Sequence, residues 1–313
     1  MRWRYAYLVL SVGVLSSLIV LPVGAQDAQT LPTGSAVIYG GAGLTTLNRG
    51  LSGVMRDRQI RGRTDVYAAY GVMPKLELAV DIPIVHDWVL ENPDYGPCPR
   101  QDDYCDPILS LGDAGLFAKY RFLANPLVLS GVFGALTDVW NARTREQWNN
   151  AGQGTNKLVL SLLLGHPFEV AGVPVGIDAQ AYYEVVFGRV VDYGLGPIDV
   201  PADGVGGSLR AEVRFKRFQI HAVLSALSSL YGENYDSETY GTYYASTVDR
   251  WAVLKYQEVK SLAKFSYSLS AFSGLHLSVG RLLWVHNGPP GAIDVSLGIH
   301  RWFPPRRKPS RPR

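Results

Sequence analysis

The sequence has no long apolar stretch beyond its N-terminus. Its mean hydropathy is +0.03, which is too low for a bundle of membrane-spanning helices. Outside residues 5–23, no segment approaches the roughly 20 apolar residues that a spanning helix needs. Hydrophobic residues nevertheless make up 47% of the chain, which excludes an intrinsically disordered protein. The chain is therefore expected to fold, but not as a helical membrane protein.

Cysteine is scarce, and the charge is balanced. The two cysteines, Cys98 and Cys105, lie in one segment rich in Pro and Asp. Zinc would need four ligands and no histidine is near, so a disulfide that closes this short loop is predicted, with no metal site and no cofactor. The net charge of +3 is modest, and its most basic part is the Pro-rich tail, residues 304–313. Nothing in this distribution indicates a nucleic-acid-binding module.

The N-terminus has the features of an export signal. A basic start, residues 1–4, precedes the apolar stretch, and small residues at 23–25 match the cleavage site that signal peptidase requires. Residues 1–25 are predicted to be a cleaved signal peptide, the alternative being an uncleaved anchor helix. Export also suits the predicted disulfide, because disulfides form outside the cytoplasm.

Alternation of apolar and polar residues is the main structural signal. From Leu76 to Ile84 every second residue is apolar, while Glu77 and Asp81 lie between them. A period of two is typical of a β-strand. A soluble sandwich with its charges outside and a transmembrane barrel with its charges inside both show this pattern. It recurs along the chain in segments 35–45, 64–72, 76–84, 112–122, 127–140, 157–165, 173–187, 205–215, 218–230, 254–269, 275–286 and 292–303.

The connections decide between the two classes. Short turns such as 73–74 and 216–217 alternate with long polar loops such as 88–111 and 231–250. Outer-membrane barrels have short periplasmic turns, long extracellular loops and an even number of strands, with aromatic belts at both interfaces. The sequence therefore predicts an all-β protein: an antiparallel up-and-down transmembrane barrel of about 12 strands, residues 26–303, in the outer membrane of a Gram-negative bacterium. Aromatic residues at the expected strand ends agree with two belts: Phe122, Phe168, Phe215, Phe218, Phe272 and Phe303 at the short turns, and Trp88, Trp140, Phe187, Tyr231, Trp251 and Trp284 at the long loops.

The last predicted strand resembles the C-terminal insertion signal of outer-membrane proteins. It ends in Phe303, with apolar residues at alternate positions before it. Arg301 departs from this pattern, because it falls at one of these alternate, lipid-facing positions. The barrel-assembly machinery is therefore an expected partner through this strand, together with outer-membrane lipid and small solutes.

Two segments resemble the outer-membrane transporter family that is named after the meta-pathway of phenol degradation. They are residues 70–78 (YGVMPKLEL), followed by Asp81, Ile82 and Pro83, and residues 112–121 (GDAGLFAKYR). The resemblance covers the first half of the mature chain best, and the part after the fifth strand lacks a clear Pro-Thr-Gly segment. It implies passive uptake of aromatic or other small hydrophobic compounds.

If the apolar positions face lipid, the opposite face defines the lumen. Both signs of charge occur there in similar number, which favours cross-strand ion pairs over an ion-selective lining. Aromatic residues on the same face offer a path to an aromatic solute. The predicted lumen-lining residues are Tyr67, Glu77, Asp81, Asp113, Phe117, Lys119, Arg121, Asp178, Tyr182, Glu184, Arg210, Glu212, Arg214, Glu258, Lys260, Lys264, His276, Trp284, Asp294, His300 and Trp302.

The predicted function is that of a passive channel rather than an enzyme, and two alternatives stay open. A closed barrel could act as a structural protein or an adhesin through its Tyr-rich loop, residues 231–250. An envelope lipid or ester hydrolase would use the chemistry of a Ser/His/Asp triad. The hydrolase is disfavoured because strand pairing brings polar residues together in any lumen, and because no Gly-x-Ser-x-Gly turn is present. Its candidate residues are His276, His300, Ser278, Ser296 and Asp294.

Overall fold

The computed structural model describes residues 28–51, 55–91, 108–137, 156–187, 191–192, 196–197, 203–230, 257–286 and 292–305. No helix in this part of the chain is long and apolar enough to cross a membrane. The predicted signal peptide, the loop 231–250 and the tail from residue 306 lie outside the described residues. The predicted disulfide between Cys98 and Cys105 lies outside them as well and stays a prediction.

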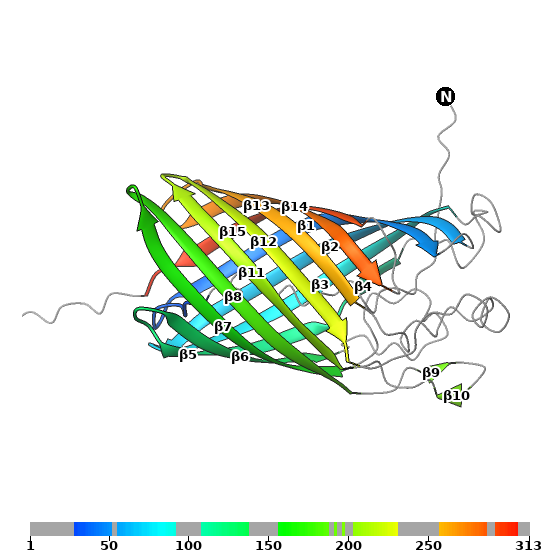
Figure 1. The fold of residues 1–313 in the computed structure, drawn as a ribbon, viewed down its shortest axis with the longest axis horizontal. Helices are drawn as coiled ribbons and strands as arrows, with labels where there is room; N and C mark the ends of the chain where they lie inside the picture. Colours follow the sequence, from blue (N-terminus) through cyan, green and yellow to red (C-terminus); the bar gives the residue numbers. More distant parts are fainter. Residues whose placement is uncertain are drawn as a thin grey trace, which may run out of the picture.

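Twelve long antiparallel strands form one closed barrel (Figure 1). Each strand pairs with its neighbours in chain order, and β1 pairs with β15 as well as with β2, which closes the sheet. This confirms the predicted up-and-down barrel. The long strands are β1 (Ala36–Leu51), β2 (Met55–Met73), β3 (Leu76–Glu91), β5 (Ala114–Leu123), β6 (Val128–Thr137), β7 (Asn156–Val170), β8 (Val173–Phe187), β11 (Gly204–Phe215), β12 (Phe218–Ser229), β13 (Gln257–Ser268), β14 (Ser273–His286) and β15 (Ile293–Phe303).

Three short strands lie outside this count. The strand β4 (Ile108–Leu111) pairs with β3 just before β5 begins, so β4 and β5 follow one another along the same neighbour. The strands β9 (Val191–Asp192) and β10 (Gly196–Pro197) pair only with each other. None of the three changes the closure of the barrel among the residues that the structure describes.

The short connections lie at one end of the barrel, on the left of Figure 1, together with the start of β1 and the end of β15. Two residues, Ala171 and Gly172, join β7 to β8 with φ angles of 51° and 79°. Positive φ at both turn positions is the geometry that matches the twist of a tight hairpin. We call this the short-turn end; in outer-membrane barrels it faces the periplasm.

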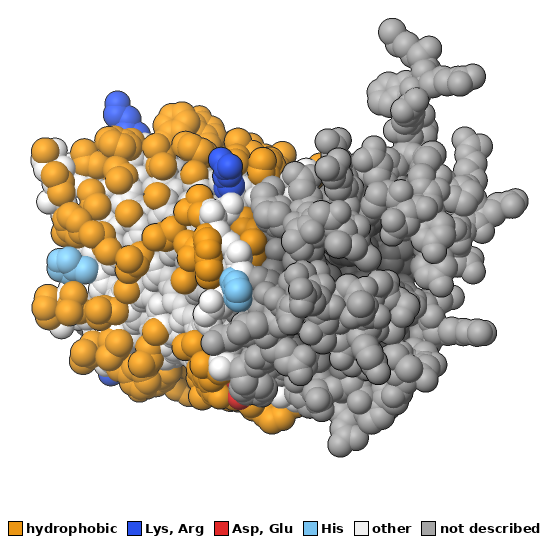
Figure 2. Space-filling model, turned by 45° about the vertical axis from the view of Figure 1, so that its right-hand side comes forward, with side chains coloured by type: hydrophobic (Ala, Val, Ile, Leu, Met, Phe, Trp, Pro, Cys, Tyr) orange, Lys and Arg blue, Asp and Glu red, His pale blue; other side chains and the backbone are white. Residues whose placement is uncertain are grey.

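The outer surface is apolar, and the inner face carries the ionised groups. Leu116 and Leu297 point outward with 64% and 61% of their surface exposed, whereas Glu258, which points inward, is 1% exposed. Hydrophobic side chains cover most of the described surface in Figure 2. A water-soluble protein would show the reverse distribution. This surface is built to contact lipid.

Exposed aromatic side chains mark both ends of the strands. Phe122, Phe215 and Phe218 lie at the short-turn end, and Phe187 and Trp284 at the other. They match the two predicted belts, as far as the described side chains reach. Such rings prefer the level of the lipid headgroups.

Several strands are longer than predicted. Residues 48–63 fall between the predicted strand segments 35–45 and 64–72, yet most of them belong to β1 and β2, which pair down to Leu51 and Met55. Likewise β7 continues to Val170 instead of ending at Gly165. A strand needs only about 10 residues to cross a bilayer. Beyond that length the backbone ladder continues without any need for apolar alternation, so the pattern cannot show where the strand ends.

Candidate functional site

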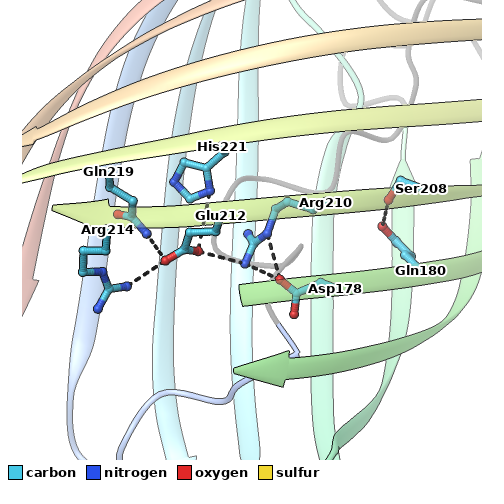
Figure 3. Close-up of polar contacts among 8 residues, drawn as sticks. All are labelled: Asp178, Gln180, Ser208, Arg210, Glu212, Arg214, Gln219 and His221. Carbon is cyan, nitrogen blue, oxygen red and sulfur yellow. Dashed lines mark hydrogen bonds and ion pairs between the residues drawn. The ribbon is translucent and has the colours of Figure 1, made fainter. Parts of the chain in front are cut away.

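A polar network joins β8, β11 and β12 on the inner face of the barrel (Figure 3). Arg210 lies directly opposite Asp178, and its Nη2 is 2.7 Å from Asp178 Oδ2. The same nitrogen lies 3.5 Å from Glu212 Oε2, and the other Glu212 oxygen lies 2.9 Å from Arg214 Nη2. His221 Nδ1 is 3.6 Å from Glu212 Oε2. Because alternate residues of β11 point inward, its Arg-Ala-Glu-Val-Arg sequence places both signs of charge side by side.

Further ion pairs connect other inward side chains. Most are cross-strand pairs, so each links two neighbouring strands as well as neutralising a buried charge. This is the arrangement that the mixed charge of the inner face predicts. The pairs and their N to O distances are Lys119 with Glu77 at 3.2 Å, Lys157 with Glu184 at 3.4 Å, Lys260 with Glu258 at 3.2 Å, Arg63 with Asp65 at 2.5 Å and Arg63 with Asp81 at 3.7 Å.

An apolar cluster fills part of the lumen next to β5, β6, β7 and β8. Val159 and Leu163 of β7 point inward and are fully buried, and they pack with Phe117 of β5 and Tyr182 of β8. Leu227 of β12 packs against the same cluster. Side chains thus narrow the passage at this level, as expected for a barrel of this size.

Glycines let two of the inward rings lie against the wall. A Cβ on Gly134, which faces Phe117 across the β5–β6 pairing, would come within 2.6 Å of the Phe117 ring. A Cβ on Gly206 would overlap the ring of Tyr182. The rings therefore occupy space that any other residue would fill, and they lie over the neighbouring strand rather than across the lumen.

Gly206→Ala is expected to destabilise the barrel by roughly 1–3 kcal/mol. The added methyl would meet the Tyr182 ring and would lie 2.7 Å from the carbonyl oxygen of Ala226. Gly40 faces outward, and nothing lies within 4 Å of its Cβ position, so Gly40→Ala is the matched control. Urea unfolding in detergent, followed by tryptophan fluorescence, measures both variants. Equal stability of the two would contradict the close approach at Gly206.

The residues before β1 run inside the barrel at its short-turn end. Ala28 is buried, and its carbonyl oxygen accepts a hydrogen bond of 2.5 Å from Ser130 Oγ of β6. The Leu31 N–H donates a hydrogen bond of 2.8 Å to Glu77 Oε2 of β3. Both partners are inward side chains, so the chain crosses the short-turn opening before it joins the wall.

A cavity of about 480 Å³ occupies the short-turn half of the lumen. Residues 28–32 form one side, and inward residues of β1, β14 and β15 form another. Here the rings of Tyr39 and His276 stack with centroids 4.6 Å apart, and those of His276 and His300 with centroids 5.7 Å apart. Trp302 lines the same cavity near its mouth. The volume lies within the range of sites for small molecules.

The structure places most of the predicted lumen residues on the inner face, and Asp113 half-buried just before β5. The cavity brings ten of them together, whereas residues such as Asp81 and Glu258 line the lumen elsewhere. Their role in a solute path stays a prediction. The inward residues are Tyr67, Glu77, Asp81, Phe117, Lys119, Arg121, Asp178, Tyr182, Glu184, Arg210, Glu212, Arg214, Glu258, Lys260, Lys264, His276, Asp294, His300 and Trp302.

Trp284 is the exception, and its predicted place in the lumen is wrong. Strict alternation along β14 would point it inward, but the register between β13 and β14 shifts by one residue between Val259 and Lys260. Trp284 consequently pairs with Val259, which faces outward, and is 50% exposed, while Leu282 is 6% exposed. The extra residue, Leu283, forms a β-bulge that turns Trp284 into the outer aromatic belt.

The two lumen histidines of β14 and β15 stack on each other instead of forming a catalytic triad. Among the described residues, neither His276 nor His300 hydrogen bonds to Ser278, Ser296 or Asp294, and His276 Nε2 has no hydrogen-bond partner. A bond between nucleophile and base is the signature of such a site. The described part of the chain also holds no group of three His, Cys, Asp or Glu arranged for a metal ion.

Sequence reasoning missed three parts of the site. Tyr39 and His221 lie at odd positions of predicted strands whose other odd residues face inward, so alternation could have found both. Residues 28–32 carry no such signal, because they precede the first strand and make two of their hydrogen bonds to lumen side chains through backbone groups.

The sequence matches no known family profile and no curated protein, so the resemblance to the phenol-degradation transporter family stays a prediction. Among solved structures, the COG4313 outer membrane channel from Pseudomonas putida F1 is similar, with a TM-score of 0.62 at 15% identity over 88% of this chain and 98% of that chain. The NanC porin is similar with a TM-score of 0.50 at 8% identity over 84% of this chain and 98% of that chain. These likenesses show that the chain has the fold of outer-membrane barrels.

Proposed function

We propose that this chain is a channel in the outer membrane of a Gram-negative bacterium, through which small aromatic or otherwise hydrophobic solutes diffuse passively. The observation that carries this proposal is the cavity inside the barrel, whose wall includes the stacked rings of Tyr39, His276 and His300. Flat ring faces offer contact area to an apolar solute without requiring a specific hydrogen bond.

Most charged side chains beside the cavity neutralise one another. The carboxylates of Asp178 and Glu212 and the guanidinium of Arg210 already hold each other in ion pairs. Paired charges attract free ions less than a ring of one sign would, so the lining does not select strongly for cations or anions. An aromatic solute can then pass over the rings while the ion pairs keep the wall in place.

The test is the single-channel conductance of refolded protein in a planar bilayer, with phenol or glycerol added to the bath. Phenol is expected to reduce the current in a concentration-dependent manner, and glycerol at equal concentration is not. Trp302→Ala removes a ring from the cavity wall and is expected to weaken this block, while Phe215→Ala removes an outward ring and serves as the matched control. Equal block in both variants would argue against an aromatic path past Trp302.

The apolar cluster in the lumen favours a second candidate, a closed barrel with a structural or adhesive role. Val159 and Leu163 are fully buried although they point inward. If heat-modifiable gel mobility shows that the protein is folded, yet no current is recorded in the bilayer, the open channel is contradicted. Shortening the loop 231–250 would then test for the loss of partner binding.

A further inference from the structure

Lys264 differs from the other described lysines of the lumen. Lys119, Lys157 and Lys260 each have a carboxylate oxygen within 3.4 Å. Lys264 lines the cavity and is only 6% exposed, yet no carboxylate of the described residues lies within 4.0 Å of it. A buried ammonium group without a counter-ion is costly. The position is therefore suited to a negatively charged group that comes from outside the wall.

The strands beside Lys264 supply no such group. Directly opposite it lie His221 of β12 and Ser278 of β14, and the next inward residue towards the short-turn end of β13 is Ser266. None of these carries a negative charge. The register of these strands thus leaves the ammonium group without an acidic partner among the described residues.

The carboxylates of the cavity are already engaged. Each lies in an ion pair with another cation, so none is left over for Lys264 among the described residues. The pairs are Glu77 with Lys119, Asp178 with Arg210, and Glu212 with both Arg210 and Arg214.

A second polar atom and a set of rings line the same cavity as Lys264. His276 faces Ser266 across the β13–β14 pairing, and its buried Nε2 has no hydrogen-bond partner. The ring of His276 stacks on that of His300, and Trp302 follows on the same inner face towards the mouth. One side of the cavity thus combines a cation, polar donors and flat apolar surface.

We propose that Lys264 binds the carboxylate of a small aromatic acid, with Ser266 and His276 Nε2 as further donors and with the ring of the acid against His300 and Trp302. The inference deepens the proposed function and rests on it, since it names a class of solute for the same lumen. A charge-assisted bond supplies affinity for the carboxylate, and the rings select for an aromatic group over an aliphatic one. A single ammonium group suits a monocarboxylate better than a phosphate, for which several donors are usual.

The test is isothermal titration of the folded, full-length mature protein in detergent with benzoate, benzyl alcohol and acetate. Benzoate is expected to bind at least about tenfold more tightly than either of the others, because only benzoate presents both charge and ring. Lys264→Met should reduce the affinity for benzoate by about tenfold or more and leave that for benzyl alcohol unchanged. Lys264→Arg should retain much of the affinity.

Lys216→Met is the matched control, because it removes one positive charge from the exposed turn between β11 and β12. Equal benzoate affinity in the wild type and in Lys264→Met would overturn the proposal. If Lys264→Met does not fold, binding of benzyl alcohol as tight as that of benzoate to the wild type would overturn it instead. Binding is measured without transport. Benzoate binding by a barrel that conducts no current would therefore overturn the proposed channel and leave the proposed binding site. A barrel that conducts current but binds benzoate equally well without Lys264 would overturn the proposed binding site and leave the proposed channel.

Discussion

Deleting residues 28–32 is expected to raise the single-channel conductance severalfold. This segment crosses the short-turn opening and forms one side of the cavity, so its removal widens that half of the lumen. The barrel wall should stay intact, because the segment precedes β1 and contributes no strand to the sheet. Planar-bilayer recordings of the variant and the wild type at equal salt concentration measure the effect.

A graded version of the same experiment identifies the contacts that hold the segment. Ser130→Ala removes the hydrogen bond to the Ala28 carbonyl, and we expect an intermediate rise in conductance, since such a bond contributes about 1 kcal/mol. Ser208→Ala is the matched control, because Ser208 bonds to Gln180 of the wall and not to the segment. Deletion of residues 306–313 controls for shortening of the chain. Unchanged conductance after deletion of 28–32 would show that the apolar cluster around Leu163 sets the limit instead.

The fold could be predicted because every barrel strand has one face that only lipid contacts. The alternation from Leu76 to Ile84 is strict for that reason, and the structure places Leu78 and Ile82 outside and Glu77 and Asp81 inside. The sorting of short and long connections then distinguished the membrane barrel from a soluble sandwich. Both signals are local in the sequence, so neither depends on knowing which strands pair.

The details of the site depend on pairing, and alternation does not contain that information. Trp284 and Leu282 have the same parity, and only the bulge opposite Val259 separates them. Lys264 and Lys260 likewise share one face of β13. Lys260 lies 3.2 Å from Glu258 of its own strand, but only the register shows that Lys264 faces His221 and Ser278.

Arg210→Met is expected to lower the free energy of unfolding by about 3 kcal/mol. The guanidinium group is buried and holds two carboxylates, Asp178 at 2.7 Å and Glu212 at 3.5 Å, so its loss leaves both without this cation in a poorly solvated wall. Arg214→Met is the matched control: it lies on the same strand and contacts the same Glu212 at 2.9 Å, but its side chain is 58% exposed. Solvent screens that pair, and its loss should cost less than about 1 kcal/mol. Urea unfolding in lipid vesicles measures both.

The double variant Arg210→Met with Asp178→Asn separates the ion pair from the loss of packing. If the pair carries the effect, adding Asp178→Asn should recover part of the stability, because the buried negative charge is removed together with its partner. Equal costs for Arg210→Met and Arg214→Met would contradict the role of burial.

Arg210→Met also bears on permeation. Removal of the Arg210 charge leaves the carboxylates of Asp178 and Glu212 in excess beside the cavity, so the current should shift towards cations. If stability and ion selectivity change together in this variant, the same ion pairs hold the strands together and line the passage.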